Sequence, residues 1–484
     1  MSTKPRRLGR GPHRRGRGRA TTVAGQFLLA GLLVALESSG CYATGDGPAP
    51  DDARIYFPTG LAISPTGNTL FVANSDFDLR FAAGTVQAFD LGLVRAEVAR
   101  CLSAKTTSCY GTDAGPFLRS SVRIGAFASD LRVIPRLDAS GAQIDATGAK
   151  GRLVLPVRGD ATLTLIDYEE SAGGVLLRCS RDAAINSKGG TCAPEWRIGR
   201  EPSNARAITL GGEPFAVALP SSFADPGFTE QGGIAAVVHQ SSGDVSLFVG
   251  VSAEGTPPTA KLAYALTGLS PSGTAIGALD ILERKDQPRT PRFLVTSRSK
   301  SFVQILQYVR DQGVADRGSL TLVDNVLMPT QASGFDTRGV VVDPPNPGET
   351  RPTRVFLTSR SPASIVVGEL DGTRLRFFEN VPMPIGPARI TRMVVDEGFG
   401  PRTRIVASAF DARSFVVYDP DGRRISAVVP THRGPYAFAQ DTKNKLGFVA
   451  NFTDSTVQVI DLDPSHPTYQ SIVFSIGIAN GPLG

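Results

Sequence analysis

Short apolar runs separated by polar turns dominate the chain from residue 54 onward. Each unit starts with a turn containing Gly or Pro and an apolar run, followed by a polar turn and a second apolar run. A short turn and a run of alternating polarity come next, and many units add a fourth run. Runs of this length and alternation are typical of β-strands. The unit recurs seven times, with first strands near residues 61, 131, 215, 278, 339, 392 and 436.

The seven repeats predict an all-β fold. The second strands of the middle repeats read LVLPVR (153–158), AAVVHQ (235–240), FLVTSR (293–298), VFLTSR (355–360) and IVASAF (405–410). One such unit cannot bury its hydrophobic faces alone, but units stacked face to face around an axis can. We therefore predict a seven-bladed β-propeller with four-stranded antiparallel blades over residues 54–484, after an N-terminal signal and tether segment.

The first and last repeats carry the clearest motifs. The first reads PTGLAISPTGNTLFVAN (58–74) and TVQAFD (85–90), and the last reads GFVANFTDSTVQVIDL (447–462). These segments resemble the YVTN-type β-propeller repeat of bacterial and archaeal surface proteins, which implies the same fold. The five middle repeats keep the strand pattern without that signature. Either 471–476 or 54–57 can close the ring, and we expect 471–476 because it follows the preceding strand by an ordinary loop.

Positive charge is concentrated in the N-terminal segment. Residues 1–40 carry a net charge of +7, whereas the remainder of the chain carries −1. A protein that binds nucleic acid needs a basic field on its folded domain. We therefore predict no nucleic-acid partner.

The N-terminal segment also has the pattern of a secretory signal peptide. A basic region precedes 14 mostly apolar residues (23–36), which are too few to span a bilayer comfortably, and small residues follow. The sequence SSGC (38–41) resembles the lipobox of bacterial lipoproteins, in which the cysteine becomes the lipidated first residue of the mature chain. We expect a signal peptide over 1–40, lipidation of Cys41 and a polar tether over 41–53. The alternative is an ordinary cleaved signal peptide in which Cys41 occurs by chance.

The other four cysteines support export. They form two local pairs, Cys101 with Cys109 and Cys179 with Cys192, in insertions at 95–121 and 170–205. In an oxidising compartment these pairs are expected to be disulfides, each stabilising its short loop by about 2–3 kcal/mol. A four-cysteine zinc site is the competing interpretation, but neither pair has the spacing of zinc ligands. We expect an exported lipoprotein that faces the periplasm or is exposed on the outer membrane.

Polar residues end most second strands, which in a propeller lie around one mouth of the central channel. The aligned positions are Asn74, Arg158, Gln240, Arg298, Arg360, Ala409 and Asn451, and nearby turns and first strands add Arg132, Arg338, Arg389, Arg392 and Arg433. Guanidinium groups bind anions in a bidentate manner, so this set predicts a site for an anionic ligand. The candidate ligand-binding residues are Asn74, Arg158, Gln240, Arg298, Arg360, Asn451, Arg392 and Arg433. The competing interpretation is that these residues bond neighbouring blades and acidic turns.

Catalytic motifs are scarce. Outside the N-terminal segment the histidines are His239, His432 and His466, and the sequence holds no nucleophile elbow, haem-attachment motif or phosphate-binding loop. We therefore identify no catalytic residue, metal site or cofactor. The favoured function is a non-catalytic binding or scaffold protein, anchored by its lipid to the membrane, with a protein, peptide or glycan partner in the cell envelope. We expect a monomer. The alternative is a propeller hydrolase or lyase, similar to lactonases, with its site at the channel mouth.

Overall fold

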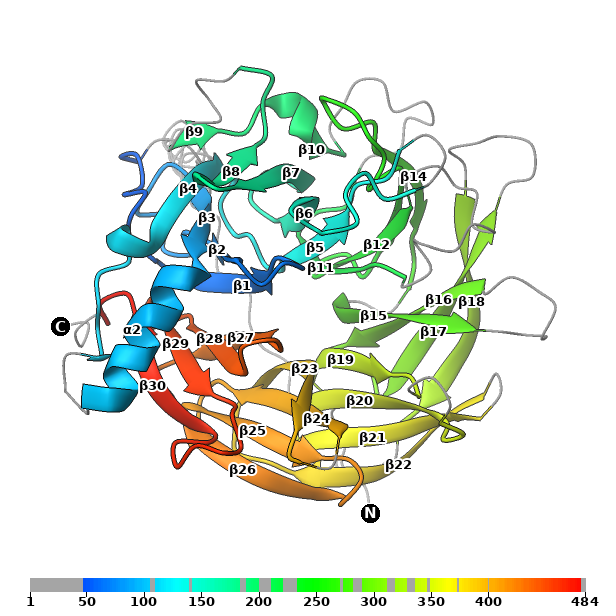
Figure 1. Cartoon of the computed structure of the whole chain (residues 1–484). Helices are drawn as coiled ribbons and strands as arrows, with labels where there is room; N and C mark the ends of the chain where they lie inside the picture. Colours follow the sequence, from blue (N-terminus) through cyan, green and yellow to red (C-terminus); the bar gives the residue numbers. More distant parts are fainter. Residues whose placement is uncertain are drawn as a thin grey trace, which may run out of the picture. The chain divides into compact units, whose positions relative to one another are not determined.

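Seven antiparallel sheets follow one another around a central axis, as the sequence predicts (Figure 1). The computed structural model describes residues 47–104, 109–138, 142–182, 189–199, 210–220, 233–269, 273–281, 290–310, 318–328, 336–345, 349–371, 374–398 and 400–479. The predicted signal peptide and Cys41 lie outside these residues. Each sheet is one blade, so the protein is a seven-bladed β-propeller.

The first two blades carry the insertions. Blade 1 contains β1 (Pro58–Ile63), β2 (Thr69–Asn74), β3 (Gly84–Asp90) and β4 (Leu118–Ile124). Blade 2 contains β5 (Arg132–Pro135), β6 (Lys150–Val157) and β7 (Thr162–Ser171), and its outer strand is split into β8 (Gly174–Arg178) and β10 (Arg197–Ile198). Between β8 and β10 lie β9 (Gly190–Thr191) and the 3-10 turn η3 (Pro194–Trp196).

Blades 3 to 7 each contain four consecutive strands. Blade 3 comprises β11 (Pro214–Ala218), β12 (Ile234–His239), β13 (Val245–Val249) and β14 (Lys261–Leu266); blade 4 comprises β15 (Gly273–Ile281), β16 (Thr290–Ser297), β17 (Phe302–Arg310) and β18 (Gly318–Leu327). Blade 5 comprises β19 (Thr337–Asp343), β20 (Thr353–Arg360), β21 (Ala363–Asp371) and β22 (Arg374–Pro382). Blade 6 comprises β23 (Pro387–Asp396), β24 (Pro401–Ala409), β25 (Ser414–Asp419) and β26 (Arg424–Pro430). Blade 7 comprises β27 (Pro435–Asp441), β28 (Leu446–Asn451), β29 (Thr456–Asp461) and β30 (Ser471–Ile476).

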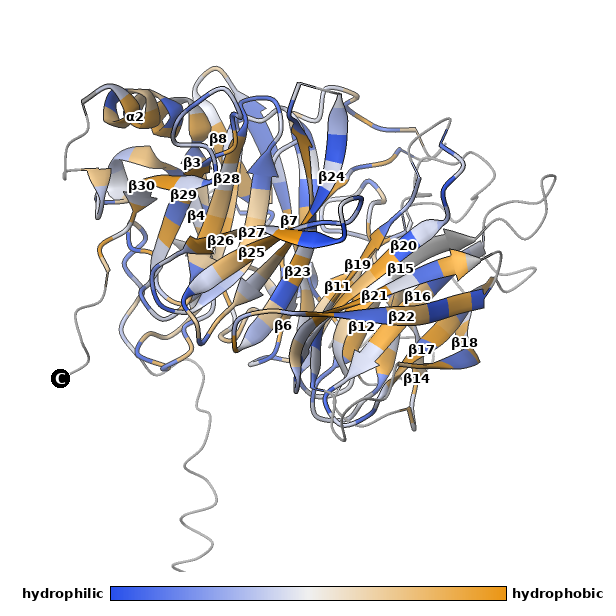
Figure 2. Cartoon of the chain, turned by 90° about the horizontal axis from the view of Figure 1, so that it is seen from below, coloured by the Kyte–Doolittle hydropathy of each residue, from blue (hydrophilic) through white to orange (hydrophobic). Residues whose placement is uncertain are grey.

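The hydrophobic core is divided among the contacts between adjacent blades. Successive side chains of a strand point to opposite faces, so Leu70 and Val72 of β2 pack against blade 7, whereas Phe71 and Ala73 pack against blade 2. The described residues contain one such cluster at each of the seven blade contacts. Figure 2 shows hydrophobic residues along the inner strands of the sheets. Because both faces of an inner strand are buried, no blade is stable alone and the ring closes on itself.

The C-terminal strand completes the last blade, which confirms the expected ring closure. Strand β30 pairs with β29, so blade 7 is built from one continuous stretch of chain. The alternative segment 54–57 runs between blades 7 and 1, where the Phe57 amide donates to Ser455 Oγ at 3.1 Å and the Tyr56 amide donates to Asn74 Oδ1 at 3.2 Å.

A helix that the strand pattern did not predict lies between β3 and β4. Helix α2 (Leu91–Ala104) buries Leu91, Val94 and Val98 at helical spacing, and lies beside β30 (Figure 1). Asp90 caps it, because its Oδ1 accepts hydrogen bonds from the amides of residues 92 and 93 at 2.8 and 3.2 Å. The 3-10 turn η2 (Gly115–Phe117) then leads into β4, so the insertion that we expected at 95–121 spans 91–117.

Both predicted disulfides are present, which indicates an oxidising, exported compartment. Cys101–Cys109 ties the end of α2 to the segment before η2. Cys179–Cys192 closes the loop between β8 and β9, and β9 pairs in parallel with β4 of blade 1. The second insertion therefore links the outer edges of blades 1 and 2.

The described part of the predicted tether contacts blade 1. The carbonyl of Pro48 accepts a hydrogen bond from the Ala82 amide at 3.0 Å, and the carbonyl of Asp52 accepts one from Gln87 Nε2 at 2.7 Å. Residues 47–53 therefore lie against the propeller.

Candidate functional site

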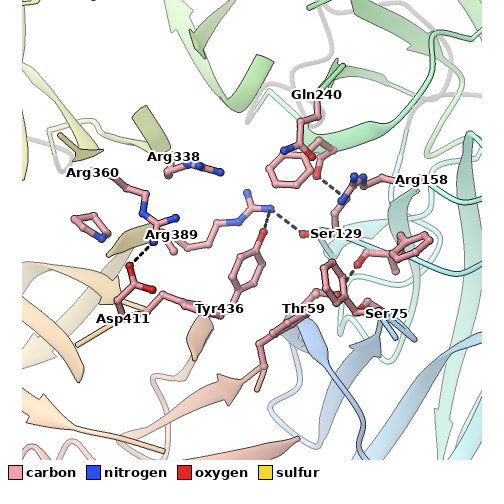
Figure 3. Close-up of a pocket in the computed structure, with 18 residues that line it drawn as sticks. Thr59, Ser75, Ser129, Arg158, Gln240, Arg338, Arg360, Arg389, Asp411 and Tyr436 are labelled. Atoms are coloured by element: carbon pink, nitrogen blue, oxygen red, sulfur yellow. Dashed lines mark hydrogen bonds and ion pairs between the residues drawn. The ribbon is translucent and has the colours of Figure 1, made fainter. Parts of the chain in front are cut away.

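A pocket of about 330 Å³ lies on the ring axis, lined by residues from six blades (Figure 3). We call it the channel pocket. Its lining comprises Thr59, Ser75, Phe77, Phe127, Ala128, Ser129, Arg158, Phe215, Gln240, Arg338, Arg360, Pro387, Ala388, Arg389, Phe410, Asp411, Tyr436 and Phe452. This volume is at the lower end of the range for small-molecule sites.

One backbone arrangement, repeated from blade to blade, builds this lining. In six blades, the amide of the residue after the second strand, or in blade 5 of its last residue, donates to a carbonyl in the turn that precedes the first strand of the same blade. The donor–acceptor pairs are Ser75–Phe57, Arg158–Phe127, Gln240–Glu213, Arg360–Asp336, Phe410–Gly386 and Phe452–Gly434. All six donor residues line the pocket. The turn thus fixes the backbone, and the side chain after the second strand is free to vary between blades.

Arg389 forms the floor of the channel pocket. It follows Pro387 and Ala388 at the start of β23, where the first strands carry a β-bulge. Its amide donates to Ser408 Oγ at 2.9 Å, so Arg389 lies opposite Ser408. The corresponding bulge positions of five other blades hold small residues, namely Gly60, Ala216, Ala275, Gly339 and Ala437. Of the six blades compared, blade 6 alone has a long side chain at this position, and the Arg389 side chain extends into the channel.

The Arg389 guanidinium reaches across the channel from blade 6 to blade 2. Its Nη2 donates to the Ser129 carbonyl at 2.8 Å and to the Tyr436 hydroxyl at 3.2 Å (Figure 3). The guanidinium carbon also lies 5.2 Å from the ring centre of Phe215 and 5.1 Å from that of Tyr436, within cation–π range. Burial disfavours the charged form, but Tyr436 and Asp130 outweigh it and raise the pKa of Arg389. Arg389 is therefore a fixed, permanently charged group.

Aromatic side chains form the wall of the pocket. We call Phe77, Phe127, Phe410, Tyr436 and Phe452 the aromatic collar. The Phe77 ring meets the rings of Phe127 and Phe452 edge to face, at centre distances of 5.9 and 5.2 Å. Phe452 also contacts Phe410 and Tyr436 at 6.0 and 6.3 Å. Phe77 remains 52% exposed, so an apolar surface stays open to solvent at the rim.

The other three arginines of the lining are paired with carboxylates. Arg158 Nη2 lies 2.7 Å from Glu213 Oε1, and Arg338 holds Asp336 through Nη2 and Nε at 2.7 and 2.6 Å. Arg360 pairs with Asp411. Ser75 Oγ and Gln240 Oε1 are buried and have no hydrogen-bond partner among the described residues. The pocket therefore offers one arginine without a carboxylate partner in the described chain, and two polar atoms available to a ligand or water.

The structure brings three of the eight candidate residues into the channel pocket: Arg158, Gln240 and Arg360. Asn74 and Asn451 are buried one residue earlier in their strands, where their amides donate to polar side chains on the third strand of the same blade. Arg298 lies 3.6 Å from Asp336. Arg392 pairs with Asp343 at 2.9 Å and Arg433 pairs with Asp454 at 2.6 Å, both outside the lining.

A one-residue difference in register explains the two asparagines. β-Pairing places Asn74, His239, Ser297, Ser359, Ala409 and Asn451 opposite the first residues of their first strands. The sequence alignment instead matched Asn74, Ala409 and Asn451 with residues one position later in the other blades. A shift of one residue moves a side chain to the opposite face of a sheet. In the corrected register Ser75, Phe410 and Phe452 take their places.

The aromatic collar and the role of Arg389 are further features that the sequence did not single out as a binding site. Phe410 and Phe452 each directly follow a second strand, so a corrected register would have identified them. Arg389 was noted among the nearby arginines but was not selected, because nothing local to its sequence indicates contact with Ser129.

No metal site or membrane-spanning helix is found in the part of the chain that the structure describes. Within those residues no three His, Cys, Asp or Glu side chains are grouped so that they could hold a metal ion. Among the same residues, no helix is long and apolar enough to cross a membrane.

Comparisons with known proteins show distant structural likeness. No protein-family model and no curated protein matches the chain. Hydrazine synthase of Kuenenia stuttgartiensis is similar over 87% of this chain and 99% of its own, with 12% identity and a TM-score of 0.49. The periplasmic gluconolactonase PpgL of Pseudomonas aeruginosa is similar over 82% and 94%, with 13% identity and a TM-score of 0.46. A protein from Lactobacillus plantarum matches over 80% and 88%, with 12% identity and a TM-score of 0.44. The assignment to the class of seven-bladed propellers rests on the seven sheets themselves.

Proposed function

We propose that this propeller is a non-catalytic binding protein of the cell envelope, held at the membrane through a lipid on Cys41, and that the channel pocket is its binding site. The observation that carries the proposal is the pocket itself: a cavity of about 330 Å³ in which four arginines and an aromatic collar converge on the ring axis. A concave site with an apolar wall and a few convergent polar groups is the usual form of a small-molecule site.

The chemistry of the lining favours binding over catalysis. Its charged groups are guanidiniums, which stay protonated and cannot act as general bases at neutral pH. Asp411, the carboxylate of the lining, is paired with Arg360. The groups that face the cavity therefore suit recognition of an anion.

The envelope location is supported by three features of the chain. The two disulfides fit an oxidising compartment, the YVTN-like first and last repeats resemble those of surface proteins, and SSGC (38–41) resembles a lipobox. A lipid on Cys41 would attach the chain to the membrane.

Blocking the pocket tests the binding role. In Gln240→Trp a bulky indole replaces a side chain of the lining, whereas Lys443→Trp places the same group on the exposed turn between β27 and β28. The wild-type protein and both variants are purified from their native envelope, and the small molecules released on denaturation are compared by mass spectrometry. We expect a compound that is retained by the wild type and by Lys443→Trp but lost from Gln240→Trp. Identical profiles for all three proteins contradict a binding role for the pocket.

The intact mass of the mature protein tests the anchor. A chain that begins at Cys41 with a diacyl or triacyl adduct supports the proposal, and Cys41→Ser should then appear in the soluble fraction without the adduct. An unmodified mature chain overturns the anchor and leaves the pocket unaffected.

A further inference from the structure

We infer that the ligand of the channel pocket is a small organic monocarboxylate with a flat apolar body, whose carboxylate is bound by Arg389 and whose body lies within the aromatic collar. This inference rests on the proposed function, since it names the ligand class of the same site. It starts from the distribution of charge over the four arginines of the lining.

Three of these arginines already have a carboxylate within ion-pairing distance. Glu213 neutralises Arg158, Asp336 neutralises Arg338 and Asp411 neutralises Arg360. Arg389 has no carboxylate within 4 Å in the described chain, and both of its side-chain hydrogen bonds go to neutral acceptors. The pocket therefore carries an excess of one positive charge, located at its floor.

Asp130 does not cancel that charge. Its carboxylate accepts hydrogen bonds from the amides of Leu131 and Val217 at 2.9 and 3.3 Å, and Arg132 lies 3.3 Å from it. Burial works against the carboxylate, but Arg132, Arg389 and these amides hold the pKa of Asp130 below its ordinary value. Asp130 is shared between Arg132 and Arg389, so the three groups together carry one net positive charge, which a ligand with a single negative charge balances.

The geometry of the floor favours a carboxylate. Phe215 and Tyr436 hold the guanidinium at 5.2 and 5.1 Å from their ring centres, and both hydrogen bonds start from Nη2. The Nε and Nη1 groups are not used in these bonds, and each can donate a charge-assisted hydrogen bond to a carboxylate oxygen. Because the bonds to Ser129 and Tyr436 already fix the side chain, little rotamer entropy is lost when the ligand binds.

The wall of the pocket selects the rest of the ligand. The aromatic collar offers ring edges and faces, which favour a flat apolar group by stacking. A volume of about 330 Å³ holds a small molecule rather than a protein loop or a glycan chain. Ser75 Oγ and Gln240 Oε1 are both buried and have no partner among the described residues. The serine hydroxyl can donate or accept a hydrogen bond with a polar substituent, and the glutamine oxygen can accept one.

The test measures binding of phenylacetate, its neutral analogue phenylacetamide and the dianion phenylphosphonate by titration calorimetry. We expect phenylacetate to bind the wild type at least about tenfold more tightly than phenylacetamide, because one charge-assisted hydrogen-bonded pair contributes at least that factor. Arg389→Gln should remove this preference, and Arg389→Lys should keep part of it because the charge remains but the planar set of donors is lost. Arg298→Gln, which removes an exposed cation outside the lining, should change the affinity less than about twofold.

Circular dichroism shows whether the Arg389 variants are folded, and Arg389→Lys remains informative if Arg389→Gln is unstable. Equal binding of phenylacetate and phenylacetamide, preference for the dianion, or no binding of phenylacetate at millimolar concentration overturns the monocarboxylate class. If a retained compound is nevertheless lost from Gln240→Trp, the proposed binding function stands and only the ligand class is wrong. If no retained compound is lost from that variant either, both are wrong.

Discussion

Asp76 lies between two residues of the channel pocket, Ser75 and Phe77, and carries a buried carboxyl group. Its side chain is 0% exposed, and its φ of 49° is in the left-handed region. Oδ1 accepts a hydrogen bond from the Phe81 amide at 3.1 Å, whereas Oδ2 has no partner among the described residues. Burial raises the pKa of Asp76 from 3.8 to about 6, assisted by Asp78 and opposed by the Phe81 amide.

We predict that Asp76→Asn stabilises the protein at neutral pH. A shift of roughly two pKa units corresponds to about 3 kcal/mol by which the ionised carboxylate destabilises the fold. Because the folded-state pKa is raised, the folded protein binds a proton more readily than the unfolded chain between about pH 4 and pH 6. The destabilisation is therefore complete above pH 6 and is relieved as the pH falls through that range. Asparagine has the same shape, accepts the Phe81 amide and tolerates the left-handed conformation.

Thermal unfolding of wild type and Asp76→Asn, followed by calorimetry, measures this effect. An unfolding entropy of about 2.1 cal/mol/K per residue converts 3 kcal/mol into a Tm increase of about 3 °C for a propeller of this length. The advantage should fall to about 1 kcal/mol near pH 4.5, where most of the wild-type carboxyl is protonated. Asp78→Asn, an exposed carboxylate two residues further on, is the control and should change stability by less than about 0.5 kcal/mol. A lower Tm for Asp76→Asn at neutral pH, or an increase that does not change with pH, would refute the reasoning.

Three further substitutions test how the blades are held. Arg152→Met removes a buried guanidinium that lies 2.6 Å from Asp167 and donates to two carbonyls of blade 3. We expect the free energy of unfolding, measured with denaturant, to fall by about 3–5 kcal/mol. Adding Asp167→Asn should restore part of this loss. Cys179→Ala with Cys192→Ala opens a disulfide across a separation of 13 residues and should cost about 3 kcal/mol; reducing agent should then lower the Tm of the wild type more than that of the double variant. Asp90→Ala should lower the free energy of unfolding by about 1 kcal/mol because the cap of α2 is lost. Asp90→Asn should keep most of the stability that the cap contributes.

The repeat of strands was readable from the sequence because the blade architecture imposes a period on the chain. Inner strands such as β2 and β28 must be apolar on both faces, and the turns between them must be polar, so the pattern survives even in the repeats without the YVTN signature. The ring closure followed from the same argument, since β30 lies an ordinary loop after β29. The starts of β15, β19 and β23 were placed two to five residues too late, because a bulge separates their first residues from the regular part of each strand.

The residues that line the pocket were harder to identify because their positions depend on register and on contacts between distant blades. Asn74 and Asn451 end conspicuous motifs, yet their amides are committed to the buried polar pairs within blades 1 and 7. The contact between Arg389 and the Ser129 carbonyl joins residues 260 positions apart. No local pattern encodes such a contact. Helix α2 was missed for a different reason: residues 95–121 were taken as an insertion around the Cys101–Cys109 pair, although Asp90 is a recognisable cap.

The residue types at the ends of the second strands differ between the two sides of the ring. In the corrected register the positions after the second strands are Ser75, Arg158, Gln240, Arg298, Arg360, Phe410 and Phe452, so polar residues occupy blades 1 to 5 and aromatic residues occupy blades 6 and 7. At six of these positions, all except Arg298, the same backbone hydrogen bond is present, and it constrains only the main chain. A symmetric ring has no structural need for this division, because the repeated turn accepts any side chain there. The asymmetry fits a ligand whose apolar body lies against Phe410 and Phe452, while Arg158, Gln240 and Arg360 line the pocket from blades 2, 3 and 5.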